Sequence, residues 1–263
     1  MLTRKIFAAM TAITAIALTH SSAPTMADTA DNATQAKALV DKLAQSVKDA
    51  KAFDYEATVS AGNISETGVV GTPNVYRVMC KEQEPNSFRI TVVDDSHVTV
   101  AEFASGKDGG IFFDAKHNSY FAFPPLNSDA DWGAMHAAVD KVTGGPDLGN
   151  VVDSTLIHKP MFDLDGQYHR DSPVTYSVTQ TTMDGHKVSR VREQCTTDGA
   201  PMEEAVAIDS DGNLMAYSAY IVINKVPILA QRQLFKSLKL LTDPLPDSAF
   251  QFTPPAGAQR LGG

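Results

Sequence analysis

The chain has 263 residues, 43% of them hydrophobic and 20% charged, and its net charge is −9. This length is sufficient for a large core. The acidic balance argues against nucleic acid and against an anionic membrane surface as partners, because negative charges repel phosphates. The motifs of P-loop NTPases, serine hydrolases, zinc proteases and dinucleotide-binding enzymes are absent from the sequence, and the histidines lack the spacing of metal ligands. We therefore predict a protein that is not an enzyme and that uses no cofactor and no metal.

Residues 1–27 have the pattern of a secretory signal peptide. Arg4 and Lys5 precede an apolar run over 6–18, and Thr25 and Ala27 are small residues at the cleavage positions. The apolar run is shorter than the about 20 residues that a membrane-spanning helix needs. We predict cleavage near Ala27 and a periplasmic mature chain, residues 28–263, without a transmembrane segment. The leader holds two basic residues and no acidic ones, so the net charge of the mature chain is 20 − 31 = −11.

The mature chain begins with an amphipathic helix and continues as a series of short strands. Ala36, Leu39, Val40, Leu43 and Val47 recur at the three- and four-residue spacing of one helix face. From residue 53 apolar and polar residues alternate, which indicates a half-buried strand. Further strand-like runs cover 75–80, 88–93, 98–103, 111–113 and 120–123. The turns between them are too short for helical crossovers, so the pattern predicts an antiparallel meander.

A helical insertion is predicted over residues 128–158. Ser128 and Asp131 form a capping-box pattern, and Trp132, Met135 and Val139 follow at helical spacing until two glycines end the pattern. A second short helix is expected after residue 146. An insertion in a meander must lie on a sheet face or across a barrel mouth. This one is either a fixed cap on the core or a movable lid.

The second half of the chain returns to strands. These are predicted over 174–182, 187–195, 204–208, 214–223 and 229–240. The run 214–223 lacks the alternation of a strand with one wet face, so both of its faces need cover, or it lines a cavity that holds an apolar ligand. Tyr217 and Tyr220 in this run are therefore candidate cavity residues.

The end of the chain predicts one more short strand. Pro244 and Pro246 stop the element before it, because proline lacks an amide donor and fixes φ. Phe250 and Phe252 then share one face of an extended segment, and a pair of prolines ends the ladder. We expect this strand to close the sheet.

The sequence has two cysteines, Cys80 and Cys195, and both lie in strand-like segments of the exported part. An oxidising compartment permits a disulfide bridge between them. The alternative is two separate buried thiols, which behave as small apolar groups. Neither belongs to a Cys-x-x-Cys pair, so a catalytic role is not expected.

Several short motifs occur in the order in which LolA-type lipoprotein carriers have them. Pro85-Asn86-Ser87-Phe88-Arg89 resembles the Pro-x-x-Phe-Arg segment of that family, and 105–114 with 118–120 resembles its next hairpin. The ending with Phe250 and Phe252 resembles the family's last strand, and the resemblance spans most of residues 35–261. It implies a mainly β fold with helices, in one domain over 28–263. In that fold an incomplete antiparallel β-barrel, a half barrel, is covered by the N-terminal helix and by the mid-chain insertion.

The resemblance also implies a function. Members of that family carry lipids or the acyl chains of lipoproteins through the periplasm in an apolar cavity, so we expect a binding or carrier protein for such a ligand. In the family the strand arginine bonds to the helical lid, and Arg89 is the position that matches; the alternative is a surface arginine on the convex face. The other function considered is an envelope sensor or interaction protein on the same fold that binds a protein partner. The candidate cavity and lid residues are Arg89, Phe121, Phe123, Trp132, Met135, Tyr217 and Tyr220.

Overall fold

The structure is a computed structural model that describes residues 26–61, 64–65, 68–69, 74–143, 147–153, 155–157, 173–197, 200–223 and 226–262. The predicted signal peptide lies outside these residues except for Met26 and Ala27, which begin α1 (Met26–Asp49), so the leader stays a prediction. None of the helices in the described part is long and apolar enough to cross a membrane.

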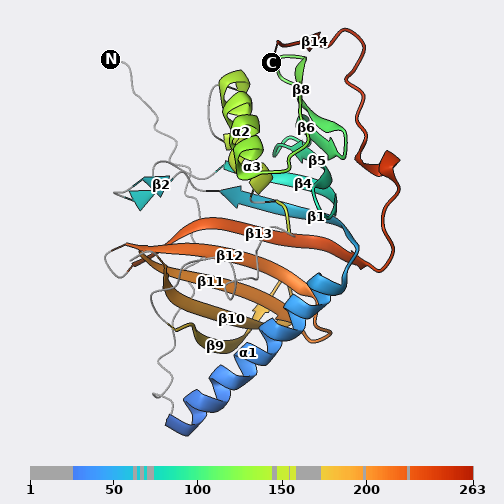
Figure 1. Ribbon diagram of the computed structural model, residues 1–263. Helices are drawn as coiled ribbons and strands as arrows, with labels where there is room; N and C mark the ends of the chain where they lie inside the picture. The colour runs from blue at the N-terminus through green and yellow to red at the C-terminus, as the bar shows by residue number, and fades with distance from the viewer. Residues whose placement is uncertain are drawn as a thin grey trace, which may run out of the picture.

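One 12-stranded sheet forms the body of the molecule (Figure 1). Its first half comprises β1 (Ala52–Ala61), β4 (Asn74–Gln83), β5 (Ser87–Val93), β6 (Thr99–Gly106), β7 (Gly109–Asp114) and β8 (Ser119–Phe123). Its second half comprises β9 (Thr175–Met183), β10 (His186–Thr197), β11 (Ala200–Asp209), β12 (Leu214–Ile223) and β13 (Val226–Leu241). The short β14 (Gln259–Arg260) completes it, while β2 (Ile64–Ser65) and β3 (Gly68–Val69) form a separate hairpin.

The sheet is open and almost entirely antiparallel. The strand order is β14-β8-β7-β6-β5-β4-β1-β13-β12-β11-β10-β9, and the two outermost strands do not pair with each other. The long strand β13 pairs with β1 from Ala52↔Leu241 to Ala61↔Gln231, so the first and second halves of the chain join in the middle of the sheet. The predicted fold class, an incomplete antiparallel barrel covered by helices, is confirmed.

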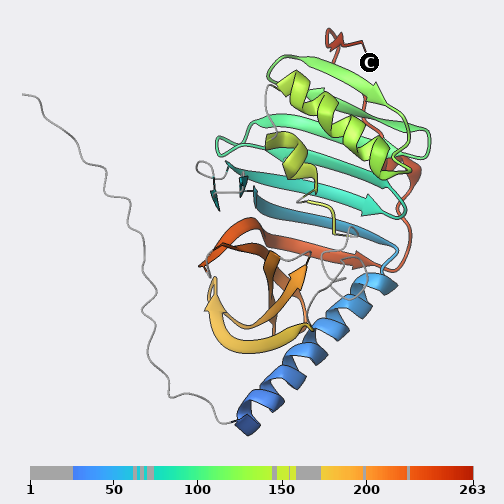
Figure 2. The same ribbon diagram turned by 60° about the vertical axis from the view of Figure 1, so that its left-hand side comes forward.

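The helices lie on one face of the sheet, which we call the inner face; the opposite face is the outer face. The helix α1 packs against β9 and β10, whereas α2 (Asp129–Thr143) and α3 (Asp147–Asp153) pack against each other and over the first half (Figure 2). The predicted helices over 36–50 and within 128–158 are therefore confirmed. One hydrophobic cluster contains buried residues from all three helices and from both halves of the sheet.

The open edge at β9 is protected by a side chain of α1. The Asn32 side-chain amide donates to the Val178 carbonyl at 2.7 Å, and the Val178 amide donates back to the Asn32 side-chain oxygen at 2.8 Å. These two bonds use the backbone groups that an edge strand would otherwise offer to another chain.

Both faces of β12 are covered, as its lack of alternation predicts. Tyr217 is 5% exposed and belongs to the main core of the inner face. Ala216 and Ser218 point to the outer face and are also buried, at 7% each. In this part of β12, therefore, the side chains on both faces are buried, whereas an ordinary surface strand has one buried and one exposed face.

The predicted closing strand at Phe250 and Phe252 is wrong. Residues Asp247–Phe250 form a short 3-10 helix, η1, and the chain then runs across the outer face of β5 and β6 without joining the ladder. It reaches the sheet only at β14, which pairs in parallel with β8. The Gln259 amide donates to the Asn118 carbonyl at 2.9 Å, and the strand that closes the two halves is β13.

Candidate functional site

Phenylalanines line the inner face of the first half of the sheet. Cross-strand pairing places Phe103, Phe112 and Phe121 next to one another on β6, β7 and β8. The ring centroids of Phe103 and Phe112 are 4.7 Å apart, and those of Phe112 and Phe121 are 5.3 Å apart. Phe88 and Phe123 lie beside them, and all five rings are at most 8% exposed. These five phenylalanines are called the aromatic row below; they form an apolar strip across four strands.

The helix α2 covers the aromatic row. Trp132 stacks on Phe88 with ring centroids 5.7 Å apart, and Met135 and Val139 are buried on the same side of the helix. The capping box at its start is present, because the Ser128 hydroxyl donates to the Asp131 carboxylate at 2.8 Å and accepts the Asp131 amide at 3.3 Å. Of the predicted cavity residues, Phe121, Phe123, Trp132 and Met135 thus lie in one core region under or on α2. Their contact with a ligand stays a prediction.

The end of α3 is fixed to the sheet by buried polar groups. The Tyr55 hydroxyl and the Gln233 side-chain amide both donate to the Thr155 carbonyl, the second at 2.9 Å. The Ile157 amide donates to the Glu82 carboxylate at 2.9 Å. These bonds come from β1, β13 and β4, so the segment after α3 is anchored at the centre of the sheet. Burial raises the pKa of Tyr55 well above its ordinary value, which keeps its hydroxyl a donor.

No local pattern in the chain indicates this anchor. Glu82 lies in the polar run Lys81-Glu82-Gln83-Glu84, which is typical of an exposed strand end, yet its side chain is fully buried. The packing of residues 155–157 against β4 gives this buried carboxylate a hydrogen-bond donor, the Ile157 amide.

Arg89 lies on the outer face, and its predicted bond to the helical lid is wrong. Phe88 points to α2, so its neighbour on the strand must point the other way. The Arg89 guanidinium lies 3.4 Å from the Glu102 carboxylate, donates to the Gln251 carbonyl at 3.2 Å, and lies 5.7 Å from the ring centroid of Phe252. Burial raises the pKa of Glu102. The arginine therefore holds the C-terminal segment, and the surface alternative was correct.

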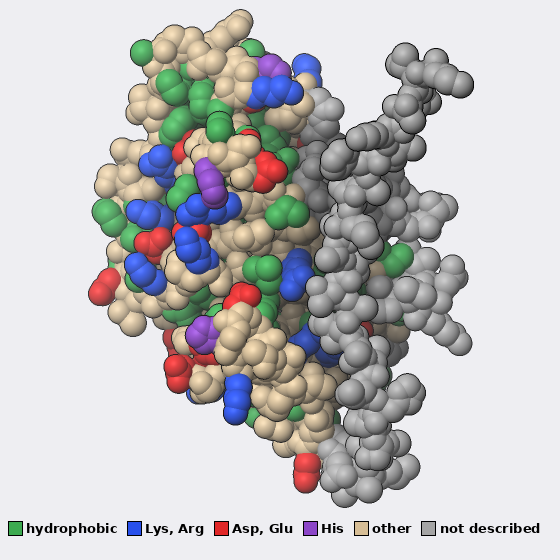
Figure 3. All heavy atoms as spheres, turned by 180° about the vertical axis from the view of Figure 1, so that it is seen from behind, with side chains coloured by type: hydrophobic (Ala, Val, Ile, Leu, Met, Phe, Trp, Pro, Cys, Tyr) green, Lys and Arg blue, Asp and Glu red, His purple; other side chains and the backbone are tan. Residues whose placement is uncertain are grey.

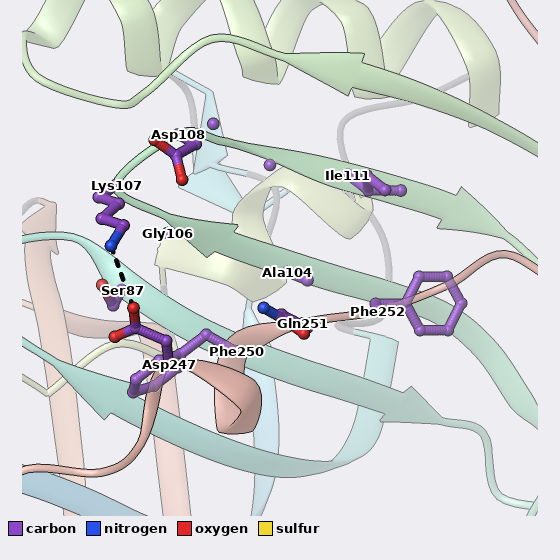
Figure 4. Close-up of a pocket in the computed structure, with 12 residues that line it drawn as sticks. Ser87, Ala104, Gly106, Lys107, Asp108, Ile111, Asp247, Phe250, Gln251 and Phe252 are labelled. Atoms are coloured by element: carbon purple, nitrogen blue, oxygen red, sulfur yellow. Dashed lines mark hydrogen bonds and ion pairs between the residues drawn. The ribbon is translucent and has the colours of Figure 1, made fainter.

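The C-terminal segment and the sheet enclose a pocket of about 280 Å³ on the outer face (Figure 4). Its walls are η1 with Phe252 on one side and the β6–β7 turn on the other. An ion pair at 3.2 Å between Lys107 and Asp247 joins these walls, but both side chains are 75% exposed, so the pair is weak. This pocket lies on the face opposite to the aromatic row.

The two candidate tyrosines of β12 are separated by the sheet. Tyr217 belongs to the main core of the inner face, whereas the Tyr220 hydroxyl accepts a hydrogen bond from Arg190 at 3.1 Å on the outer face. Tyr220 therefore does not line the region under α2, because strand alternation sends it to the other side.

The predicted disulfide bridge is wrong. Cys80 lies on β4 and Cys195 on β10, with β1, β13, β12 and β11 between them, and both are buried thiols that are not joined in a disulfide. Burial raises the pKa of Cys80 well above its ordinary value. The thiols therefore act as core groups, which was the alternative.

We expect two reactive thiols after unfolding. Labelling of the purified protein in denaturant without reductant should modify Cys80 and Cys195 fully, whereas labelling of the folded protein should be slow because both are buried. Mass spectrometry counts the added groups. Absence of labelling until a reductant is added would mean that the bridge exists.

Replacement of Arg89 by leucine is expected to loosen the C-terminal segment without affecting α2. It removes the contacts to Glu102 and Gln251, and partial exposure of the arginine limits the loss of unfolding free energy to about 1 kcal/mol. Limited proteolysis should cut the C-terminal segment faster. The control Lys107→Met breaks only an exposed pair and should change stability by less than about 0.5 kcal/mol. A change in Trp132 emission in the Arg89 variant would contradict this placement.

Comparisons with known proteins give likenesses of fold. No family model matches the chain, and no curated protein matches it. An uncharacterized conserved protein from Thermus thermophilus is 10% identical, with a TM-score of 0.42 over 86% of this chain and 98% of that one. A DUF1329 family protein from Desulfovibrio piger is also 10% identical, with a TM-score of 0.29 over 84% and 97%.

A LolA superfamily protein from Nitrosomonas europaea is among the similar structures. It is 11% identical, with a TM-score of 0.31 over 82% of this chain and 97% of that chain. At these identities and TM-scores the matches carry no conclusion about the fold or the ligand of this chain.

Proposed function

We propose that this protein is an exported, non-enzymatic binding or carrier protein of the periplasm. Its ligand would be apolar, a lipid or the acyl chain of a lipoprotein, held between the aromatic row and α2 within the single domain 28–263. The observation that supports this most is the aromatic row itself, because five adjacent rings on four strands are covered by one helix through apolar contacts. Movement of α2 away from Phe88 would expose an apolar strip without breaking the sheet.

The way in which the two helices are attached supports such a movement. The segment after α3 is held by Tyr55, Gln233 and Glu82, so it can serve as the fixed end. The start of α2 follows two prolines, and the Asn86 side chain donates to the Leu126 carbonyl just before it. The helix between these points meets the sheet through Trp132 and its apolar neighbours. Apolar contacts are not directional, so an acyl chain can replace them.

A buried hydroxyl beside the aromatic row offers a polar contact for the ligand. Ser105 is fully buried next to Phe88, and its hydroxyl has no hydrogen-bond partner within the described part of the chain. A buried polar group without a partner costs about 1–3 kcal/mol. The carbonyl or carboxylate of an acyl ligand would accept a bond from it.

Ligand binding is expected to change the fluorescence emission of Trp132, the single tryptophan of the protein. The affinity is expected to rise with the length of the acyl chain. Each buried methylene contributes about 0.8 kcal/mol, which is about fourfold in affinity. The delipidated protein should be titrated with saturated fatty acids of increasing length and with a triacylated lipopeptide. Fluorescence gives the affinity, and native mass spectrometry confirms the bound mass.

The variant Trp132→Phe serves as the control for this titration. It should bind the same ligands by mass spectrometry but give no fluorescence change. Affinity that does not depend on chain length, or an unchanged spectrum at saturating ligand, would mean that α2 is a fixed cap and that the proposed site is wrong.

A further inference from the structure

The acidic chain has a basic surface. On the outer face of β1, β4–β6 and β10–β13, strand alternation and register place eight basic and five acidic residues. The basic residues are Arg77, Lys81, Arg89, Arg190, Arg192, Arg232, Lys236 and Lys239; the acidic ones are Asp54, Glu56, Glu102, Glu203 and Asp209. The net charge of these residues is 8 − 5 = +3, so the net charge of the remainder of the chain is −9 − 3 = −12. We call this surface the basic face.

Contacts between neighbouring strands confirm the direction of these side chains. Glu56 accepts Arg77 at 2.6 Å and Lys236 at 3.0 Å, so all three project from the outer side of β1, β4 and β13. Arg192 and Glu203 lie 3.7 Å apart on β10 and β11. Seen from behind, several Lys and Arg side chains lie over the middle of this face, with Asp, Glu, His and hydrophobic side chains among them (Figure 3).

The strand β4 contributes exposed apolar side chains to the same surface. Its outward residues are Val75, Arg77, Met79 and Lys81 in alternation, and Val75 and Met79 are 55% and 41% exposed. They are two of the four exposed large hydrophobics in the described part of the chain. Apolar side chains between basic ones are the composition that binds the headgroup region of an anionic membrane, because the charges attract phosphates and the apolar groups insert below them.

Three basic residues of this face are free to take an external anion. Lys81, Arg232 and Lys239 are exposed, and none of them has an ion pair with a carboxylate of the described residues. Lys81 and Lys239 lie on either side of Asp54 in the cross-strand register, and Arg232 lies opposite Ser60 on β1. The charges are therefore spread over the two strands that flank β1 on one surface, which fits a membrane plane better than a single small ligand.

We propose that the basic face docks on an anionic phospholipid surface, although the net charge of the whole chain argues against such a partner. This does not depend on what the inner face binds. The charge excess provides the attraction, and Val75 and Met79 provide shallow apolar contact. Attraction of this kind acts within a Debye length, about 10 Å at 0.1 M salt, so acidic residues farther than this from the basic face oppose it little.

Co-sedimentation of the mature protein with vesicles tests the proposal. The vesicles contain phosphatidylglycerol and phosphatidylethanolamine in equal parts, and phosphatidylcholine vesicles serve as the neutral comparison. We expect binding to the anionic vesicles only, with release at about 1 M salt, where the Debye length is about 3 Å. The triple variant Lys81→Gln, Arg232→Gln and Lys239→Gln should bind about a hundredfold more weakly, since each basic residue contributes about fivefold.

A matched variant controls for net charge. Lys48→Gln, Lys116→Gln and Lys141→Gln neutralise three exposed lysines on α1, on the β7–β8 turn and on α2, and this variant should bind like the unchanged protein. Equal loss in both triple variants would overturn the proposal. So would binding to polyglutamate without binding to vesicles, which would indicate an acidic protein partner. Trp132 emission separates docking from ligand uptake, because Trp132 lies on the inner side of the sheet.

Discussion

Replacement of Phe112 by alanine is expected to lower the free energy of unfolding by about 3–5 kcal/mol. The ring is fully buried, and it lies between Phe103 and Phe121 in the middle of the aromatic row. Its removal leaves a cavity that strand backbones cannot close, since the sheet register fixes their positions. Urea unfolding of the mature protein, followed by circular dichroism, measures the loss. The affinity for an acyl ligand should also fall, because the same ring would contact the chain.

The variant Phe252→Ala provides the comparison for this measurement. Its ring lies on the outer face, with its centroid 5.6 Å from that of Phe113, and its removal should cost only about 1 kcal/mol. Ligand affinity should not change in this variant. Equal losses of stability in the two variants would contradict the assignment of the aromatic row as the centre of the core.

Replacement of Glu82 by leucine is expected to release the anchored end of the helical insertion. The Ile157 amide would lose its acceptor in a buried place, which costs about 1–3 kcal/mol. Hydrogen exchange at residues 155–157 should become faster, because local opening no longer breaks this bond. If α2 moves about this anchor, the leucine variant should show a changed ligand affinity as well as faster hydrogen exchange.

The variant Glu82→Gln tests the same bond with the side-chain shape preserved. Its amide oxygen can still accept from Ile157, so exchange at 155–157 should stay close to that of the unchanged protein. If the glutamine and leucine variants lose equal stability, the carboxylate charge rather than this hydrogen bond holds the segment.

Much of the fold follows from local patterns. The helix at 36–50 and the strands of the meander were predicted from periods of 3.6 and 2, because burial of one face imposes these periods on the sequence. The capping pattern at Ser128 and Asp131 located the start of α2, since the bonds of a cap lie within a few residues. Phe121, Phe123, Trp132 and Met135 were predicted as cavity and lid residues; they are buried in one core region, and their contact with a ligand stays a prediction.

The errors concern contacts between distant segments. A Phe-x-Phe segment is compatible with a strand and also with an extended segment that crosses a sheet. The two differ only in whether their backbone groups pair with a neighbouring strand. Arg89 shows the same limit, since alternation separates it from Phe88 but does not say which face the helices cover. Gly110 is typical of a turn in the sequence, yet a Cβ there would lie 2.3 Å from the Phe123 ring, so glycine makes room for the aromatic row.

The sequence by itself determined the class of fold, the helical insertion and the acidic net charge, because these depend on composition and on neighbours along the chain. Tertiary structure alone decided that Cys80 and Cys195 are far apart, that Glu82 is an anchor, and that eight basic residues share one face. Strand order and register bring residues from distant parts of the chain side by side, and neither can be read from the alternation within a single strand. A net charge of −9 therefore conceals a surface of opposite sign, since a sum over the chain does not record where each charge lies.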